Sequence, residues 1–131
     1  MLRPPRHPLF WLCGFVLWFA VLWLLSSGRP TLPDAVTIPH LDKVAHFGYF
    51  FGGGGILTAY LYCRKPSAPN WQRLIALSVI SLAFIGGLDE FHQTFTPGRS
   101  GNDCWDWLAD VLGALAGGFV FKRCHSLLKD G

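Results

Sequence analysis

Long apolar runs separated by short polar segments dominate the chain. The first run lies between Arg6 and Arg29 and has 22 residues without Asp, Glu, Lys or Arg. The second lies between Lys43 and Arg64 and has 20 residues, broken only by His46. A membrane-spanning helix needs about 17–25 mostly apolar residues. Both runs therefore predict helices that cross a membrane.

The third and fourth runs are shorter, and each has carboxylates at one end. Residues 74–88 form a run of 15 that ends before Asp89, and residues 111–121 form a run of 11 between Asp110 and Lys122. At about 1.5 Å per residue, the third run covers about 22 Å of a hydrocarbon core that is about 30 Å thick. These helices cross a membrane only if they continue through the neighbouring acidic residues.

The pattern predicts an all-α fold, a polytopic membrane protein with a four-transmembrane-helix bundle. One domain, residues 1–131, contains helices at about residues 8–26, 43–63, 72–93 and 103–121. The first run resembles a signal peptide after Arg3 and Arg6. However, its core of 17 residues exceeds the usual apolar region of about 7–15, and it lacks a clear cleavage site. We therefore interpret it as an anchor.

Small residues four positions apart indicate where these helices pack closely, since lipid supplies little hydrophobic drive for association. Such pairs are Gly48 with Gly52, Ala83 with Gly87, and Gly113 with Gly117. The first helix contains only Gly14 and many bulky side chains. We expect it at the periphery of the bundle.

The composition agrees with a membrane protein. Hydrophobic residues make up 51% of the chain and charged residues 15%, against about 25% in soluble domains. The mean hydropathy is +0.34. A soluble domain this small has too much surface to hide so much apolar mass. The composition argues against a soluble enzyme, a disordered chain and a nucleic-acid binder.

The distribution of Lys and Arg predicts the orientation. Eight lie in the N-terminal segment, the second loop and the C-terminal segment, and three lie on the other side. Because positive residues are retained in the cytoplasm, both termini are expected there. The four cysteines are spread over both sides and the first span, so no disulfide framework is expected. We expect a multi-pass protein of the cytoplasmic membrane.

Polar residues gather at three predicted helix ends on the outer side. They are Asp42, Lys43 and His46, then Asp89, Glu90, His92 and Gln93, then Arg99, Asp103, Asp106 and Asp110. One shared site explains this pattern more simply than three unrelated polar helix ends. The simpler interpretation is that Asp42 and Asp103 cap helices and that Asp106 complements a helix dipole. Asp110 lies two turns inside a span, where an ionisable group is a functional candidate.

Asp89 and Glu90 do not fit a capping role, because they lie at the negative end of a helix dipole. A cation must favour them: Arg99, Lys43, a protonated histidine, a metal or a cationic ligand. We expect Asp89 to be coupled to Arg99, and Glu90 to be the more solvated carboxylate. Arg99 either neutralises acids or binds an anion. His46 is a ligand or a hydrogen-bonded core residue, and His92 a site residue or a solvated one.

These residues resemble the VanZ-like membrane protein family. The motifs are Asp42-Lys43-x-x-His46, then Asp89-Glu90-Phe91-His92-Gln93-x-Phe95-x-Pro97-Gly98-Arg99, then Asp106-x-x-x-Asp110-x-x-Gly113. They occur in this order within about residues 41–118. The family is named after an accessory protein of teicoplanin resistance in bacteria. The resemblance implies a bacterial cell-envelope protein of an antibiotic-resistance-like family, but no particular reaction.

Three functional hypotheses follow. The first is a binding protein for a lipid headgroup, a lipid-linked precursor or a partner membrane protein, with no role for nucleic acid. Its ligand-binding residues are Asp42, Lys43, His46, Asp89, Glu90, Gln93, Arg99, Asp106 and Asp110.

The second hypothesis is an enzyme that acts on a lipid-linked phosphate or ester. Its catalytic residues are His46, Asp89, His92 and Asp110, with a histidine as general base, a carboxylate that orients it, and Arg99 on the anion. A metal-assisted form is included because histidine and carboxylates bind divalent ions. The third is an ion-coupled transporter, which four helices in one chain rarely support. The sequence leaves the metal, the cofactor, the ligand and the oligomeric state open.

Overall fold

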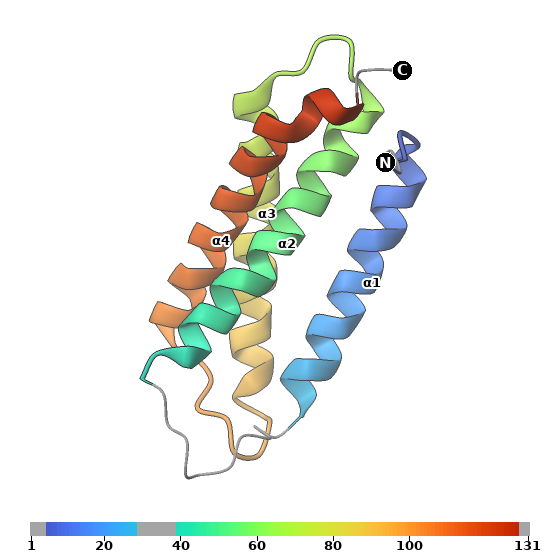
Figure 1. Cartoon of the computed structure of the whole chain (residues 1–131). Coiled ribbons are helices and arrows are strands. Elements are labelled where there is room, and N and C mark those ends of the chain that lie inside the picture. The colour runs from blue at the N-terminus through green and yellow to red at the C-terminus, as the bar shows by residue number, and fades with distance from the viewer. Residues whose placement is uncertain (1–4, 29–38, 129–131) are drawn as a thin grey trace.

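The computed structural model describes residues 5–28 and 39–128, and this part of the chain is all helical. The elements are α1 (Pro8–Ser27), α2 (Leu41–Arg64), α3 (Trp71–Gln93), α4 (Cys104–Cys124) and the short 3₁₀ helix η1 (His125–Leu128). The four long helices lie side by side, and successive helices run in opposite directions (Figure 1). The predicted all-α fold with four long helices is therefore confirmed.

Three of these helices are long and apolar enough to cross a membrane. They are α1, α3 and the continuous segment Cys104–Leu128 formed by α4 and η1. α2 has 24 residues, but its five glycines, three tyrosines and His46 lower its hydropathy. A transmembrane position of α2 therefore stays a prediction.

Local side-chain chemistry explains where the helices begin. Asn70 accepts a hydrogen bond from the backbone N–H of Arg73 at the start of α3. Asp103 accepts one from Trp105 at the start of α4, as expected for a capping carboxylate. The expectation that Asp42 caps α2 is wrong. The helix begins at Leu41 after His40, which has a left-handed backbone conformation, so Asp42 already lies in the first turn.

Glycines allow α2 and α4 to pack backbone against backbone. A Cβ atom on Gly54 would overlap the backbone of Ala114, and one on Gly117 would overlap the carbonyl oxygen of Phe51. Gly113 makes the same kind of approach, so the predicted close contact of Gly113 and Gly117 is confirmed. This packing holds the two helices at a distance at which short polar side chains reach across.

The predicted contact through Gly48 and Gly52 is wrong. A Cβ atom on either glycine would meet nothing within 4 Å. Gly54 and Gly55 face α4 instead. Successive residues of a helix are rotated by about 100°, so Gly52 and Gly48 lie on a different face of α2. The four-residue spacing of glycines correctly identified α2 as a closely packed helix, but it did not identify the face of α2 that packs on α4.

α1 lies at the periphery, as expected, with one narrow stripe that contacts the other helices. Only 17% of the residues in its most apolar 18-residue stretch are buried inside the bundle. Its buried residues are Trp18, Leu22 and Ser26, four positions apart on one face. Trp18 Nε1 donates to the carbonyl oxygen of Tyr49 at 3.0 Å, and the Tyr49 hydroxyl donates to that of Trp18 at 2.6 Å. This reciprocal pair anchors α1 on α2.

Candidate functional site

The polar residues expected at one level of the membrane lie at one end of the bundle. The start of α2, the end of α3 and the start of α4 meet there, beside the end of α1 (Figure 1). The opposite end holds the start of α1 and the η1 helix. The structure thus brings the three polar stretches together, and it arranges them in two hydrogen-bonded networks.

The first network joins α2 to α4 through Lys43. Its Nζ atom lies 2.9 Å from Asp42 Oδ2, 3.2 Å from Asp103 Oδ2 and 3.0 Å from Asp106 Oδ1. The backbone N–H of Trp105 and then the Lys43 ammonium hold the pKa of Asp103 below its ordinary value. The ammonium therefore has three carboxylate partners, and its single positive charge offsets only part of the negative charge of Asp42, Asp103 and Asp106.

His46 extends this network into the bundle. Its Nδ1 lies 2.9 Å from Oδ1 of Asp110, and its Nε2 lies 3.7 Å from Oδ2 of Asp106. Asp110 is completely buried. Gly86 on α3 makes room for it, since a Cβ atom there would lie 2.7 Å from Asp110 Oδ2. Asp110 thus lies in the interior of the site, where the sequence pattern placed it.

The second network joins α1 to α3 around Asp89. Its Oδ1 accepts a hydrogen bond from Ser26 Oγ, and its Oδ2 accepts one from Gln93 Nε2 at 2.8 Å. All three side chains are buried. Sequence reasoning missed Ser26. The available signal was a hydroxyl at the last turn of an otherwise apolar first span, at the same end as the acidic cluster.

The expected direct pairing of Asp89 with Arg99 is wrong. Arg99 Nη2 donates to the carbonyl oxygen of Leu25 at 3.1 Å, and Nε donates to that of Gly28 at 3.4 Å. These acceptors lie at the C-terminal end of α1, where carbonyl groups lack partners within the helix and a cation is favoured. Arg99 therefore ties the loop after α3 to α1.

The expectation of a solvated Glu90 is also wrong. The residue is 4% exposed, and its Oε2 accepts a hydrogen bond from the backbone N–H of Asp103 at 2.8 Å. Its other oxygen, Oε1, is buried and has no hydrogen-bond partner in residues 5–28 and 39–128. Glu90 thus links α3 to the residue that caps α4 and keeps one oxygen available.

His92 is packed on α1 rather than freely solvated. Its ring stacks on Trp23 with 3.9 Å between the centroids. Its Nδ1 is buried without a hydrogen-bond partner in the part of the chain that the structure describes. Asp34, an acidic residue of the segment between the first two apolar runs that we expect to lie in a loop outside the site, is not among the described residues.

A pocket of about 180 Å³ opens between α1, α2 and α3 at this end. Its polar lining is Ser26, Asp42, His46, Tyr49, Asp89, Gln93 and Arg99, and its apolar lining is Leu22, Leu25, Ala45 and Phe50. Asp106 and Asp110 are not part of the lining. They contact the ring nitrogens of His46 instead. The pocket can accept a ligand with both hydrogen-bonding and apolar parts.

Within residues 5–28 and 39–128, two groups of three residues could hold a metal ion. In each group the donor atoms, one from each residue, lie within 4.8 Å of one another. The first group is Asp42, Asp103 and Asp106, whose carboxylates already contact the ammonium of Lys43. The second is His46, Asp89 and Glu90, for which no Lys or Arg lies within ion-pair distance among the described residues.

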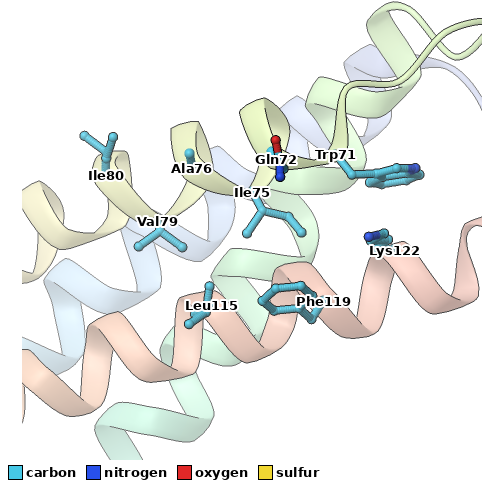
Figure 2. Close-up of a pocket in the computed structure, with 9 residues that line it drawn as sticks. All are labelled: Trp71, Gln72, Ile75, Ala76, Val79, Ile80, Leu115, Phe119 and Lys122. Carbon is cyan, nitrogen blue, oxygen red and sulfur yellow. The ribbon is translucent and has the colours of Figure 1, made fainter.

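A different groove lies between α3 and α4 towards the opposite end (Figure 2). Its volume is about 400 Å³, and apolar side chains line it except for Gln72 and Lys122. The figure shows Ile75 and Val79 facing Leu115 and Phe119 across the groove. The lining contains no carboxylate or imidazole. Of these two cavities, only the first is lined by carboxylate and imidazole groups, which can do acid–base or metal chemistry.

The membrane-length apolar helices define this chain as a membrane protein with a polar site at one end of the helices. The model of the VanZ/LLP1 family matches residues 10–127. The match covers all four long helices, and the chain belongs to the VanZ/LLP1 family. No curated protein and no solved structure matches it significantly.

Proposed function

We propose that this chain is a multi-pass protein of the bacterial cytoplasmic membrane in which all four helices cross the bilayer. α2 is long enough and packs directly against α4, and successive helices run in opposite directions. The excess of Lys and Arg, eight against three, supports a cytoplasmic location of both termini. The polar pocket then opens at the outer face.

We further propose that the pocket binds an envelope ligand with a polar headgroup and an apolar chain, namely a lipid or a lipid-linked precursor. The observation that carries the proposal is the mixed lining of the 180 Å³ pocket. Gln93 and Asp89 offer hydrogen bonds close to Leu22 and Leu25. Such a boundary between polar and apolar walls matches the junction between a headgroup and its chain. A partner membrane protein would meet the same surface.

A specific contact supports membrane-embedded enzymatic activity as a second candidate. The Asp110 carboxylate holds His46 through Nδ1, which is how a carboxylate orients a histidine general base. Arg99, at the pocket, would interact with the anionic part of a lipid-linked phosphate or ester. Ser26 supplies a hydroxyl in the lining, but it is hydrogen-bonded to Asp89.

Native mass spectrometry of the protein extracted in mild detergent tests the binding proposal. Gln93→Leu removes hydrogen-bonding groups from the pocket, and we expect it to lose the lipid species that the unaltered protein retains. Gln72→Leu is the matched control, because Gln72 lies on the same helix at the opposite, apolar groove. Equal lipid retention by both variants would contradict a headgroup site in this pocket. Release of phosphate or acyl product by the unaltered protein, lost in His46→Gln, would instead support the enzyme.

A further inference from the structure

Three side chains in the pocket region combine the donor types of a metal site. His46 comes from α2, and Asp89 and Glu90 come from the last turns of α3. One donor atom from each lies within 4.8 Å of the other two. Separations of this size allow one ion to contact all three donors after small side-chain adjustments, since ligand bonds to divalent ions are about 2.0–2.3 Å long.

Glu90 supplies an independent indication that something is bound there. Its side chain is 4% exposed, and Oε1 is buried without a hydrogen-bond partner in the described part of the chain. An unpaired buried carboxylate oxygen is costly, so such atoms are usually satisfied by a partner or an ion. Its Oε2 is already engaged by the N–H of Asp103. Oε1 is therefore the oxygen left for a ligand.

The charge balance around Asp89 and Glu90 also favours a bound cation. Lys43 is committed to Asp42, Asp103 and Asp106, and Arg99 to carbonyl oxygens of α1. Asp89 accepts hydrogen bonds only from the uncharged groups of Ser26 and Gln93. Two buried carboxylates at the negative end of α3 thus lack an ion-pair partner within residues 5–28 and 39–128. A divalent ion would offset both charges.

The contact between His46 and Asp110 prepares the histidine for this role. Metal-binding histidines commonly donate their second ring N–H to a carboxylate, which fixes the tautomer. His46 Nδ1 lies 2.9 Å from Asp110 Oδ1, so Nε2, which lies 3.7 Å from Asp106 Oδ2, is the nitrogen left to coordinate an ion. Asp89 and Glu90 retain lone pairs beyond their existing hydrogen bonds. All three residues can therefore coordinate while they keep their hydrogen bonds, and only the 3.7 Å contact of His46 Nε2 with Asp106 would be given up.

We propose that His46, Asp89 and Glu90 bind one divalent transition-metal ion at the polar end of the helices. One imidazole and two carboxylates form a mixed donor set that suits an ion such as Mn²⁺. The site goes beyond headgroup binding, and it does not depend on which ligand occupies the pocket. Asp110 acts as a positioning residue that orients His46.

Mn²⁺ alone is the appropriate probe, because the four free cysteines would bind Zn²⁺ elsewhere. The full chain, purified in detergent and stripped with a chelator, is titrated while free Mn²⁺ is measured by electron paramagnetic resonance. We expect one tightly bound ion per chain and an increase of Tm on binding. A stripped protein that takes up no Mn²⁺ would overturn the proposal. This result is independent of the lipid-retention experiment, so failure of one proposal is distinguishable from failure of the other.

Variants locate the ion. Glu90→Gln preserves size, and we expect it to weaken Mn²⁺ binding at least about tenfold, because even the loss of a group that only orients a metal ligand commonly costs this much. Asp103→Asn alters the other acidic group and should leave the affinity unchanged. The reverse result, with only Asp103→Asn weakened, would place the ion beside Lys43 and overturn the assignment.

A spectroscopic measurement keeps the test decisive if Glu90→Gln fails to fold. Pulsed electron paramagnetic resonance of the unaltered protein should detect nitrogen hyperfine coupling from one imidazole. The coupling should disappear in His46→Gln and persist in His125→Gln, which lies at the opposite end of the bundle. Bound Mn²⁺ without nitrogen coupling, or coupling that survives in His46→Gln, would overturn the proposal.

Discussion

The ring of His46 and the carboxylate of Asp110 join α2 to the interior of α4, with 2.9 Å between Nδ1 and Oδ1. Asp110 has no exposed surface, and Gly86 on α3 provides the space for its second oxygen. A buried carboxylate is tolerated only when a partner compensates for its lost hydration. The position of this pair therefore depends on α2, α3 and α4 together.

Asp110→Asn should leave insertion and folding intact and abolish the function of the protein. Asn has the same shape, and a carboxylate at mid-span costs about 2.5–3.5 kcal/mol on insertion scales, so the variant inserts more easily. Rescue of a deletion strain at matched expression measures function. His46→Ala and Asp89→Asn should fail in the same assay, and Asp34→Asn should succeed. Full activity of Asp110→Asn would remove this residue from the site.

Ser26→Ala should destabilise the protein by about 1–3 kcal/mol, because it leaves an oxygen of buried Asp89 without its donor. Ser27→Ala is the matched control. The Ser27 hydroxyl is exposed and donates to the carbonyl oxygen of Trp23 in its own helix, so its loss should cost less than about 0.5 kcal/mol. Unfolding of both variants in detergent measures the difference. Equal stability of the two would argue against a structural contact of α1 with Asp89.

Asp103→Ala should lower stability by about 1 kcal/mol, and Asp103→Asn by less, because Asn also caps helices. The pKa of Asp103 in the folded protein is below its ordinary value. The associated stability is therefore fully present above the unfolded-state pKa and is lost as the pH falls through the folded-state pKa.

The comparison of acid unfolding profiles isolates this contribution. Asp103→Asn should lose less stability than the unaltered protein between about pH 5 and pH 3, the range in which an unfolded aspartate takes up its proton. Identical losses in that range would show that Asp103 contributes nothing through its charge.

Gly54→Ala should destabilise the bundle by about 1–3 kcal/mol or more, because its methyl group would overlap the backbone of Ala114, which has no alternative rotamer. Gly52→Ala should instead be neutral or stabilising by about 0.5–1 kcal/mol, since it meets no atom within 4 Å and Ala favours a helix. Thermal unfolding of both variants in the same detergent provides the measurement. Similar Tm changes would contradict the close packing of α2 on α4.

Native cysteines test the orientation. Cys104 lies at the start of α4 beside the polar site, and Cys124 lies at its other end, and both are exposed. Variants that keep only one of these cysteines are expressed in intact cells. A membrane-impermeant maleimide should label Cys104 directly and should reach Cys124 only after the cells are permeabilised. Labelling of Cys124 alone in intact cells would reverse the proposed topology.

The sequence by itself determined the properties that depend only on the order and spacing of residues along the chain. The lengths of the apolar runs predicted four helices, and their charged ends placed Asp42, Asp89 and Asp106 at one level. Helix periodicity identified Gly113 with Gly117 as a packing face, and the dipole argument showed that Asp89 needs a partner. Such inferences hold because a helix converts residue spacing directly into height and angle.

Only the tertiary structure decided which partner each group has. Arg99 is bonded to carbonyl groups of α1, Asp89 is bonded to Ser26, and Glu90 is buried against the start of α4. The helix-dipole argument shows that Asp89 needs a compensating group, but it does not choose among the several polar groups that lie at the same level of the bundle. That choice depends on how far each helix is rotated about its axis. Close packing sets this rotation, as Gly54 against Ala114 does for α2 and α4.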